Sequence, residues 1–176
     1  MKTDALKMLD LTSTHELMEK LYGKNEVESN VARYKDLVAK FEKEFGDKDM
    51  LIFTSPGRTE ISGNHTDHNH GKVLAGSINL DCVGVAAKND SNIVNIVSET
   101  FNQKFSINLA DLSPSSKMAG TVDLVKGLLK GFEEKGYTVG GFDAYITSNV
   151  ISAAGVSSSA AFEMLLCSML NVFFND

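Results

Sequence analysis

The stretch NVISAAGVSSSAAFEML, residues 149–165, joins the end of a strand-like segment to a loop of small residues and then to a long apolar helix. Small residues let a backbone approach an anion closely, and the first amides of a helix have no carbonyl partner within the helix. Phosphate suits this arrangement, because the free amides and the helix dipole both attract negative charge. Serine hydroxyls at the same place are hard oxygen ligands of the kind that Mg²⁺ prefers. The stretch therefore predicts a nucleotide phosphate loop.

This loop alone leaves two interpretations open. No GxxxxGK[ST] segment occurs in the chain, so the loop is not a Walker loop and the fold is not a P-loop fold. Ser157 and Ser158 are also ordinary residues for capping a helix, and the alanines around them allow close packing. A second motif is needed to decide between a phosphate site and a capped helix.

Hydrophobic periodicity on either side of the loop predicts an α+β fold. Apolar residues recur at helical spacing over 28–45 and 120–136, and the dense apolar positions of 161–174 predict a core helix. Another helix is expected to start near Ser13 or Thr14, whose hydroxyls would cap it. Strands are predicted over the ranges 50–57, 72–78, 80–88, 92–99, 104–109 and 142–149, and their arrangement looks antiparallel. Pro56 and Gly57 are expected to end the first of them. The expected class is α+β, with a mixed or antiparallel sheet packed with helices.

Length and charge limit the number of domains and the kind of partner. The chain has 176 residues, enough for one domain, and no linker or repeat divides it. Its net charge is -6, and no basic stretch offers nucleic acid an electrostatic footprint. A small molecule or another protein is the expected partner.

Two further patterns concern the compartment. The stretch MKTDALKMLD carries acids and lacks the continuous apolar core of a signal peptide, so no secretion is expected. The longest apolar stretch is interrupted and too short for a bilayer, so no membrane role is expected. Cys82 and Cys167 stand far apart among apolar neighbours, without the spacing of a disulfide framework. We expect both to be reduced and buried, which suits the cytoplasm.

The second motif is GRTEISGNHTDHNHG, residues 57–71, which follows the strand at 50–57. A metal site is one interpretation, because His and Asp are common ligands. The histidines lie in a loop bounded by glycines, however, and no distant cluster of ligands is present to complete a shell. A turn that contacts a substrate is the favoured interpretation.

Taken together and in order, SPGRTEISGNHTDHNHG, TSNV and AAGVSSSAA resemble the galactokinases of the GHMP small-molecule kinase superfamily. The first stretch is similar to the signature GRxNxxGEHTDYNxG and the last to the phosphate loop GxGLSSSA. The resemblance implies the N-terminal domain of GHMP kinases, which is like ribosomal protein S5 domain 2, over residues 1–176. It also implies a C-terminal domain, carrying the general base, that is absent from this chain.

The resemblance assigns a role to each matching position. It implies ATP-dependent phosphorylation of galactose at the C1 hydroxyl, with Arg58 stabilising the charge of the transferred phosphoryl group. The expected sugar-binding residues are Asn64, His65, Thr66 and Asp67. The expected ATP-binding residues are Ala153, Ala154, Gly155, Val156, Ser157, Ser158 and Ser159, with Ser159 the candidate ligand of Mg²⁺.

This sequence departs from the signature at three places. Asn64 stands where the family has glutamate, Glu60 where it has asparagine, and His68 where it has tyrosine. An amide in place of a carboxylate keeps an acceptor but loses its charge. Two alternatives therefore stay open: a sugar- and nucleotide-binding pseudokinase or sensor, and a kinase for a related hexose or hexosamine.

Overall fold

The computed structural model describes residues 2–63, 70–115, 120–150 and 155–176. Its centre is a five-stranded sheet in the order β1-β2-β5-β3-β4. Neighbouring strands are antiparallel except for β3 and β5, which are parallel, so the sheet is mixed. The strands are β1 Leu51–Ser62, β2 Leu74–Lys88, β3 Ile93–Ser98, β4 Gln103–Asn108 and β5 Phe142–Ser148.

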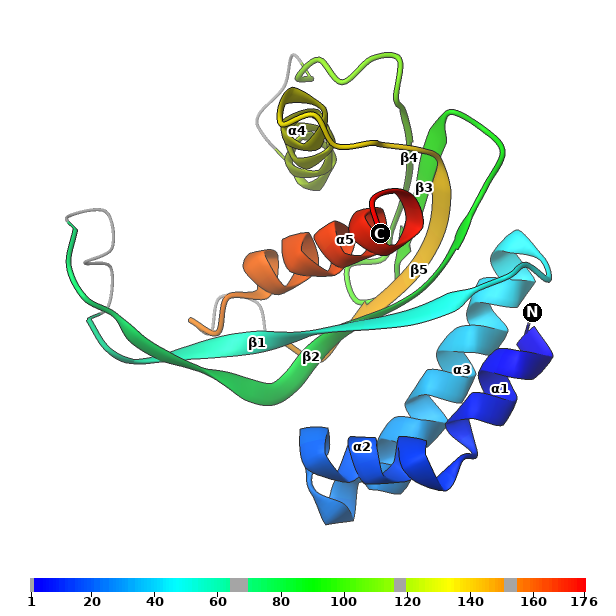
Figure 1. The fold of residues 1–176 in the computed structure, drawn as a ribbon, viewed down its shortest axis with the longest axis vertical. Helices are drawn as coiled ribbons and strands as arrows, with labels where there is room; N and C mark the ends of the chain where they lie inside the picture. The colour runs from blue at the N-terminus through cyan, green and yellow to red at the C-terminus, as the bar shows by residue number, and fades with distance from the viewer. Residues whose placement is uncertain (1, 64–69, 116–119, 151–154) are drawn as a thin grey trace.

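Helices cover both faces of the sheet (Figure 1). One face carries the N-terminal helices, which pack on Val83, Val85 and Ala87 of β2. The other face carries the remaining two helices, which pack on Cys82 and Ala86 of the same strand. Successive side chains of a strand point to opposite faces, so β2 supplies both cores. The helices are α1 Lys2–Leu9, α2 Thr12–Tyr22, α3 Val27–Phe45, α4 Thr121–Glu134 and α5 Ser158–Phe174, with a short 3₁₀ turn at Lys24–Glu26. The expected α+β class is confirmed.

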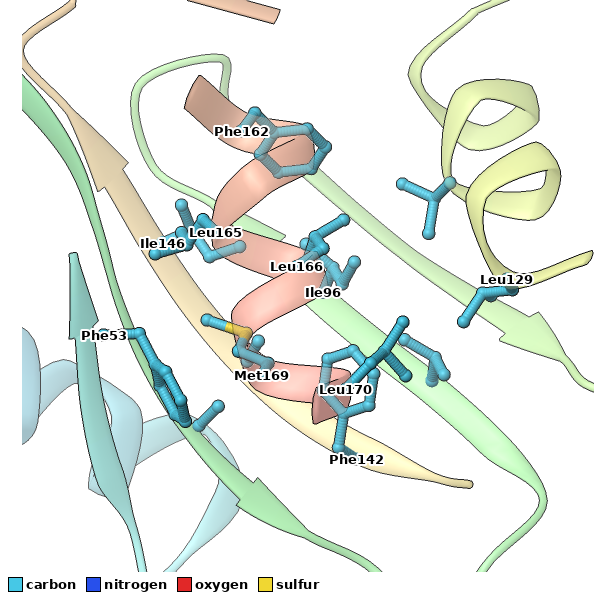
Figure 2. Close-up of a cluster of buried hydrophobic side chains, with 14 of the residues drawn as sticks. Phe53, Ile96, Leu129, Phe142, Ile146, Phe162, Leu165, Leu166, Met169 and Leu170 are labelled. Carbon is cyan, nitrogen blue, oxygen red and sulfur yellow. The ribbon is translucent and has the colours of Figure 1, made fainter. Parts of the chain in front are cut away.

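The long C-terminal helix α5 forms the larger core. Figure 2 shows its side chains Leu165, Leu166, Met169 and Leu170 lying against residues of the sheet and of α4. All four are at most 1% exposed. Burying each such side chain contributes about 1.5–3 kcal/mol. The core helix predicted for 161–174 is confirmed, and its N-terminal end, where the serines lie, is fixed by this packing.

A buried carboxylate connects the N-terminal helices to the sheet. Asp81 of β2 is 3% exposed and accepts a hydrogen bond from Arg33 Nη1 on α3 at 2.7 Å. The hydroxyls of Tyr22 and Thr54 also donate to it. Burial, followed by the Asp81 hydrogen bond, raises the pKa of Tyr22, so this phenol keeps its proton and remains a donor. Arg33 thus compensates the charge of Asp81, and donors from three elements bind its carboxylate.

The helix predicted to start near Ser13 or Thr14 is present, but the capping role predicted for those hydroxyls was wrong. Helix α2 begins at Thr12, and no side chain caps it; the Thr14 hydroxyl donates to the Met8 carbonyl at 2.6 Å instead. That bond ties α2 to α1, a helix that the sequence pattern did not predict. Cys167 is half-buried rather than buried, and both cysteines are free thiols.

The strand predictions need three corrections. Strand β1 is not ended by Pro56 and Gly57 but continues to Ser62. Pro56 is tolerated because β1 is an edge strand, where a missing amide costs no ladder bond on the open side. The ranges 72–78 and 80–88 form the single strand β2, and the expected antiparallel arrangement fails for β3 and β5. In the described part of the chain, no helix is long and apolar enough to cross a membrane.

Candidate functional site

The site begins where β1 runs past the edge of the core with Arg58. Strands β1 and β2 extend together beyond the helices (Figure 1). Their pairing shifts register between Pro56 and Arg58 and again between Glu60 and Ser62. Such irregularities re-aim side chains and occur often beside active sites. Arg58 and Glu60 lie between the two shifts, on a segment that is paired but no longer packed in the core.

A backbone hydrogen bond joins this segment to the serine loop, the predicted phosphate loop of residues 153–159. The Arg58 amide donates to the Val156 carbonyl at 3.0 Å, although the two residues are far apart in the sequence. Gly57 makes this approach possible, because a Cβ there would lie 3.1 Å from the Val156 oxygen and from side-chain atoms of Ile78 and Val150. The two motifs predicted from the sequence are therefore adjacent in the fold.

The backbone of the serine loop has a left-handed conformation at Ser157, which an ordinary N-cap residue does not need. Ser157 has a φ of 61°, in the left-handed region that non-glycine residues seldom adopt. It occupies the N-cap position of α5, but its side chain makes no capping hydrogen bond. Strained residues of this kind occur often at ligand-binding sites. The interpretation of Ser157 as a capping serine is therefore wrong, and its hydroxyl is not used by the helix.

A cleft of about 300 Å³ opens at the start of α5. Hydroxyls line it from Ser158 and Ser159 of α5 and from Thr121, the first residue of α4. Phe101 forms part of the wall and is 47% exposed. The remaining lining residues are Ser98, Leu124 and Phe162. The cleft thus combines two helix N-termini with an apolar wall.

The two helix N-termini differ in charge. Asp123 lies in the first turn of α4, and hydrogen bonds from the Ser115 hydroxyl and amide lower the pKa of its carboxyl group. That carboxylate stays ionised and opposes an anion at α4. The first turn of α5 contains no acidic residue. An anion in this cleft is therefore favoured at the serine end.

Arg58 meets a carboxylate on its own strand. Its Nη2 lies 3.3 Å from Glu60 Oε1, with the arginine side chain 54% exposed and the glutamate side chain 19% exposed. Residues two apart on a strand point to the same face, which explains the pairing. The guanidinium therefore remains accessible while its carboxylate partner is largely covered.

Some predicted site residues lie outside the described residues: Asn64, His65, Thr66, Asp67, Ala153 and Ala154. Gly155 is described and has a φ of 73°, and His70, at the end of the signature, has a φ of 57°. Within the ranges that are described, no group of three or more His, Cys, Asp and Glu side chains could hold a metal ion. The contribution of the histidine loop remains a prediction.

Sequence patterns missed the far wall of the cleft. Phe101 lies in the turn between β3 and β4, and Thr121 and Leu124 lie on α4. In the sequence, Phe101 is an aromatic residue within the polar segment SETFNQ, and this contrast could have marked it as a site residue. Nothing in the spacing connects that turn to the serines, because the parallel pairing of β3 with β5 brings them together.

The chain is similar to galactokinases in sequence. The galactokinase galactose-binding signature matches residues 39–88, which include Arg58. A galactokinase of Clostridium tetani is 39% identical over 141 residues, covering 80% of this chain and 36% of that relative. One of Pyrococcus furiosus is 37% identical over 125 residues, covering 71% and 34%. The chain spans about a third of the length of these curated relatives.

Solved structures give the same result. A Lactococcus lactis galactokinase complexed with galactose superimposes with a TM-score of 0.72 at 32% identity, over 78% of this chain and 36% of that one. A mevalonate kinase of Methanococcus jannaschii superimposes with a TM-score of 0.60 over 72% of this chain and 41% of that one. At 16% identity, the second match supports the fold alone. The chain is a relative of galactokinases and matches their N-terminal part.

Proposed function

Since the chain is a relative of galactokinases, we propose that the full-length protein transfers the γ-phosphoryl group of ATP to the C1 hydroxyl of galactose. The hydroxyl oxygen bonds to the γ-phosphorus, the bond from that phosphorus to the β–γ bridging oxygen breaks, and the hydroxyl proton leaves to a base. ADP and galactose 1-phosphate are the products. This chain would supply the phosphate loop, the arginine and the sugar-binding turn of one domain, with a C-terminal domain as its partner.

The hydrogen bond from the Arg58 amide to the Val156 carbonyl carries the proposal. It fixes the strand of the arginine against the loop that would hold the triphosphate. Phosphoryl transfer depends mainly on positioning and on stabilising the charge spread over the transferred oxygens. A guanidinium on a residue whose backbone is bound to the phosphate loop would suit that task.

The cleft suggests how the nucleotide would lie. We place the phosphates at Ser157, Ser158 and Ser159, because Asp123 opposes an anion at the other helix. The base would lie toward Phe101, whose exposed ring offers a stacking surface. Mg²⁺, when bound, would neutralise charge on the phosphate oxygens, and Ser159 is its proposed protein ligand, since a hydroxyl is a suitable hard oxygen.

The sugar would bind at Asn64, His65, Thr66 and Asp67, which follow β1 in the sequence. An aspartate accepts hydrogen bonds from sugar hydroxyls, and histidine donates or accepts one. We further propose the cytoplasm as the compartment, which suits two free thiols.

The test is product formation by the full-length protein supplied with galactose and Mg-ATP. We expect galactose 1-phosphate and ADP in equal amounts. Arg58→Ala should lower kcat by about 10³- to 10⁵-fold, the range for arginines that stabilise this transition state. Lys104→Ala, which removes an exposed positive charge from β4, is the control and should leave kcat unchanged. Failure of the wild-type protein to phosphorylate any sugar would refute the proposal.

A second candidate is a sensor that binds sugar and ATP without turnover. Asn64 favours it, because an amide there replaces the charged acceptor of the galactokinase signature. Titration calorimetry separates the two functions: a sensor binds both ligands and leaves the ATP intact.

The identity of the sugar is a separate test. Asn64 replaces a charged acceptor by a neutral one, which admits a related hexose or an N-acetylated hexosamine as substrate. A panel of sugars assayed with the wild-type protein and with Asn64→Glu would rank them. A higher kcat/KM for a hexosamine than for galactose in the wild-type protein would change the assigned substrate.

A further inference from the structure

Glu60 sits beside Arg58 in a segment of β1 whose geometry is set by two irregularities. The register shifts on either side of the pair separate it from the regular ladder. The two side chains share one face of the strand and meet at 3.3 Å between Nη2 and Oε1. No other ion pair of Arg58 is present among the residues that the structure describes.

Glu60 is more buried than Arg58, and this difference indicates that Glu60 holds Arg58. The Glu60 side chain is 19% exposed and the Arg58 side chain 54% exposed. A largely covered carboxylate has little freedom to move, whereas an exposed arginine has several flexible torsions. The contact engages one guanidinium nitrogen of a group that carries five N–H donors. A donor set for phosphate oxygens therefore remains after the pair has formed.

The backbone of the same residue is fixed as well. The Arg58 amide is bound to Val156, so the main chain of Arg58 is anchored on the serine loop. The hydrogen bond restricts the backbone of Arg58, and the ion pair restricts its guanidinium group. Both restrictions are present before any substrate binds. Restricting a reacting group in advance lowers the entropic part of the activation barrier.

We propose that Glu60 is a positioning residue, which restricts the guanidinium of Arg58, the residue whose backbone is bound to the phosphate loop, and thereby raises kcat. This inference rests on the proposed function of Arg58. It assigns a role to a position where the galactokinase signature has an asparagine, so it concerns this chain and not the general motif.

The experiment compares the full-length wild type with Glu60→Gln, which keeps size and hydrogen bonding but removes the charge. We expect kcat to fall about 10- to 100-fold, the scale for a misplaced reacting group, with KM for ATP and sugar within about threefold. In an Arg58→Ala background, Glu60→Gln should cause no further loss, because Glu60 acts through Arg58. Glu44→Gln, at a surface pair with Lys104, is the matched control and should leave kcat unchanged.

Each other outcome overturns the inference. An unchanged kcat means that the pair has no role, and a higher kcat means that Glu60 neutralises Arg58. An added loss in the Arg58→Ala background, or a raised sugar KM at constant kcat, places Glu60 in contact with another group.

Failure of the proposed function is recognised separately, because the wild type itself would then form no product. In that case, NMR of ¹⁵N-arginine-labelled protein decides whether Glu60 holds Arg58. The Arg58 Nε–H signal, assigned with Arg58→Lys, should lose order in Glu60→Gln. Equal order in both proteins would refute the positioning role.

Discussion

The inner and outer halves of strand β1 belong to one ladder but are stabilised differently. The inner half, residues 51–56, pairs with residues 81–86 of β2, and its Phe53 and Ser55 are buried. The outer half, residues 58–62, pairs with residues 74–77, and Ile61 and Leu74 there are 67% and 59% exposed. Burial specifies the inner half, whereas the outer half is held mainly by ladder hydrogen bonds. The proposed catalytic arginine, Arg58, and its partner Glu60 lie in the outer half, which contributes less to the stability of the fold.

The largest effect on stability is expected at Asp81, where the inner half ends. Asp81→Asn removes the charge that compensates Arg33, whose side chain is 16% exposed. We expect a loss of about 3–5 kcal/mol in the free energy of unfolding, typical of breaking a buried pair. Denaturant unfolding followed by circular dichroism measures it. Asp10→Asn, at the exposed pair with Lys35, is the control and should cost at most about 1 kcal/mol. Equal losses in both variants would contradict the burial argument.

A matched pair of glycines tests the two halves directly. At Gly84, opposite the inner half, an added Cβ would lie 2.5 Å from Met169 Cε and 3.3 Å from atoms of Ile146 and Leu165. Gly84→Ala should therefore lower stability by about 1–3 kcal/mol through overpacking. At Gly76, opposite the outer half, nothing lies within 4 Å, so Gly76→Ala should be neutral or slightly stabilising. Melting temperatures that fall equally would show that both halves are packed alike.

Gly57 lies where the two halves join, and its substitution should separate stability from activity. Gly57→Ala pushes a methyl group to 3.1 Å from the Val156 oxygen and shifts the contact between Arg58 and the serine loop. We expect about 1 kcal/mol of lost stability, from mild overpacking. Its kcat should fall about tenfold, with Gly76→Ala as the reference. If kcat is retained, then the alignment of strand and loop does not matter for catalysis.

The smallest effect is expected at Ile61, in the outer half. Ile61→Ser changes an exposed side chain, so the free energy of unfolding should stay within about 0.5 kcal/mol. Phe53→Ser, in the inner half, should instead cost at least about 3 kcal/mol, since it empties a packed site. Chemical denaturation of both variants provides the measurement. A large loss for Ile61→Ser would indicate that another part of the full-length protein covers this side chain.

Local patterns predicted the elements better than their connections. Helices at 28–45 and 120–136 follow from the spacing of apolar residues, and each lies within two residues of the helix observed. Pro56 and Gly57 were misleading, because their local preference for a turn is overridden by pairing with β2 at an edge of the sheet. The parallel pairing of β3 with β5 depends on contacts across some fifty residues, which no local period encodes.

The sequence by itself determined the residue types of the site: one arginine after a Pro-Gly pair, and serines at the start of an apolar helix. Those types are readable because phosphate chemistry requires donors, small residues and hydroxyls in a short stretch. Only the tertiary structure decided that the Arg58 amide is bound to Val156, that Glu60 pairs with Arg58 and that Phe101 and Ser158 line the same cleft. The physical reason is that these contacts either join segments far apart in the chain or depend on burial and on the geometry of the β-bulge. Both are set by how the sheet and α5 pack together.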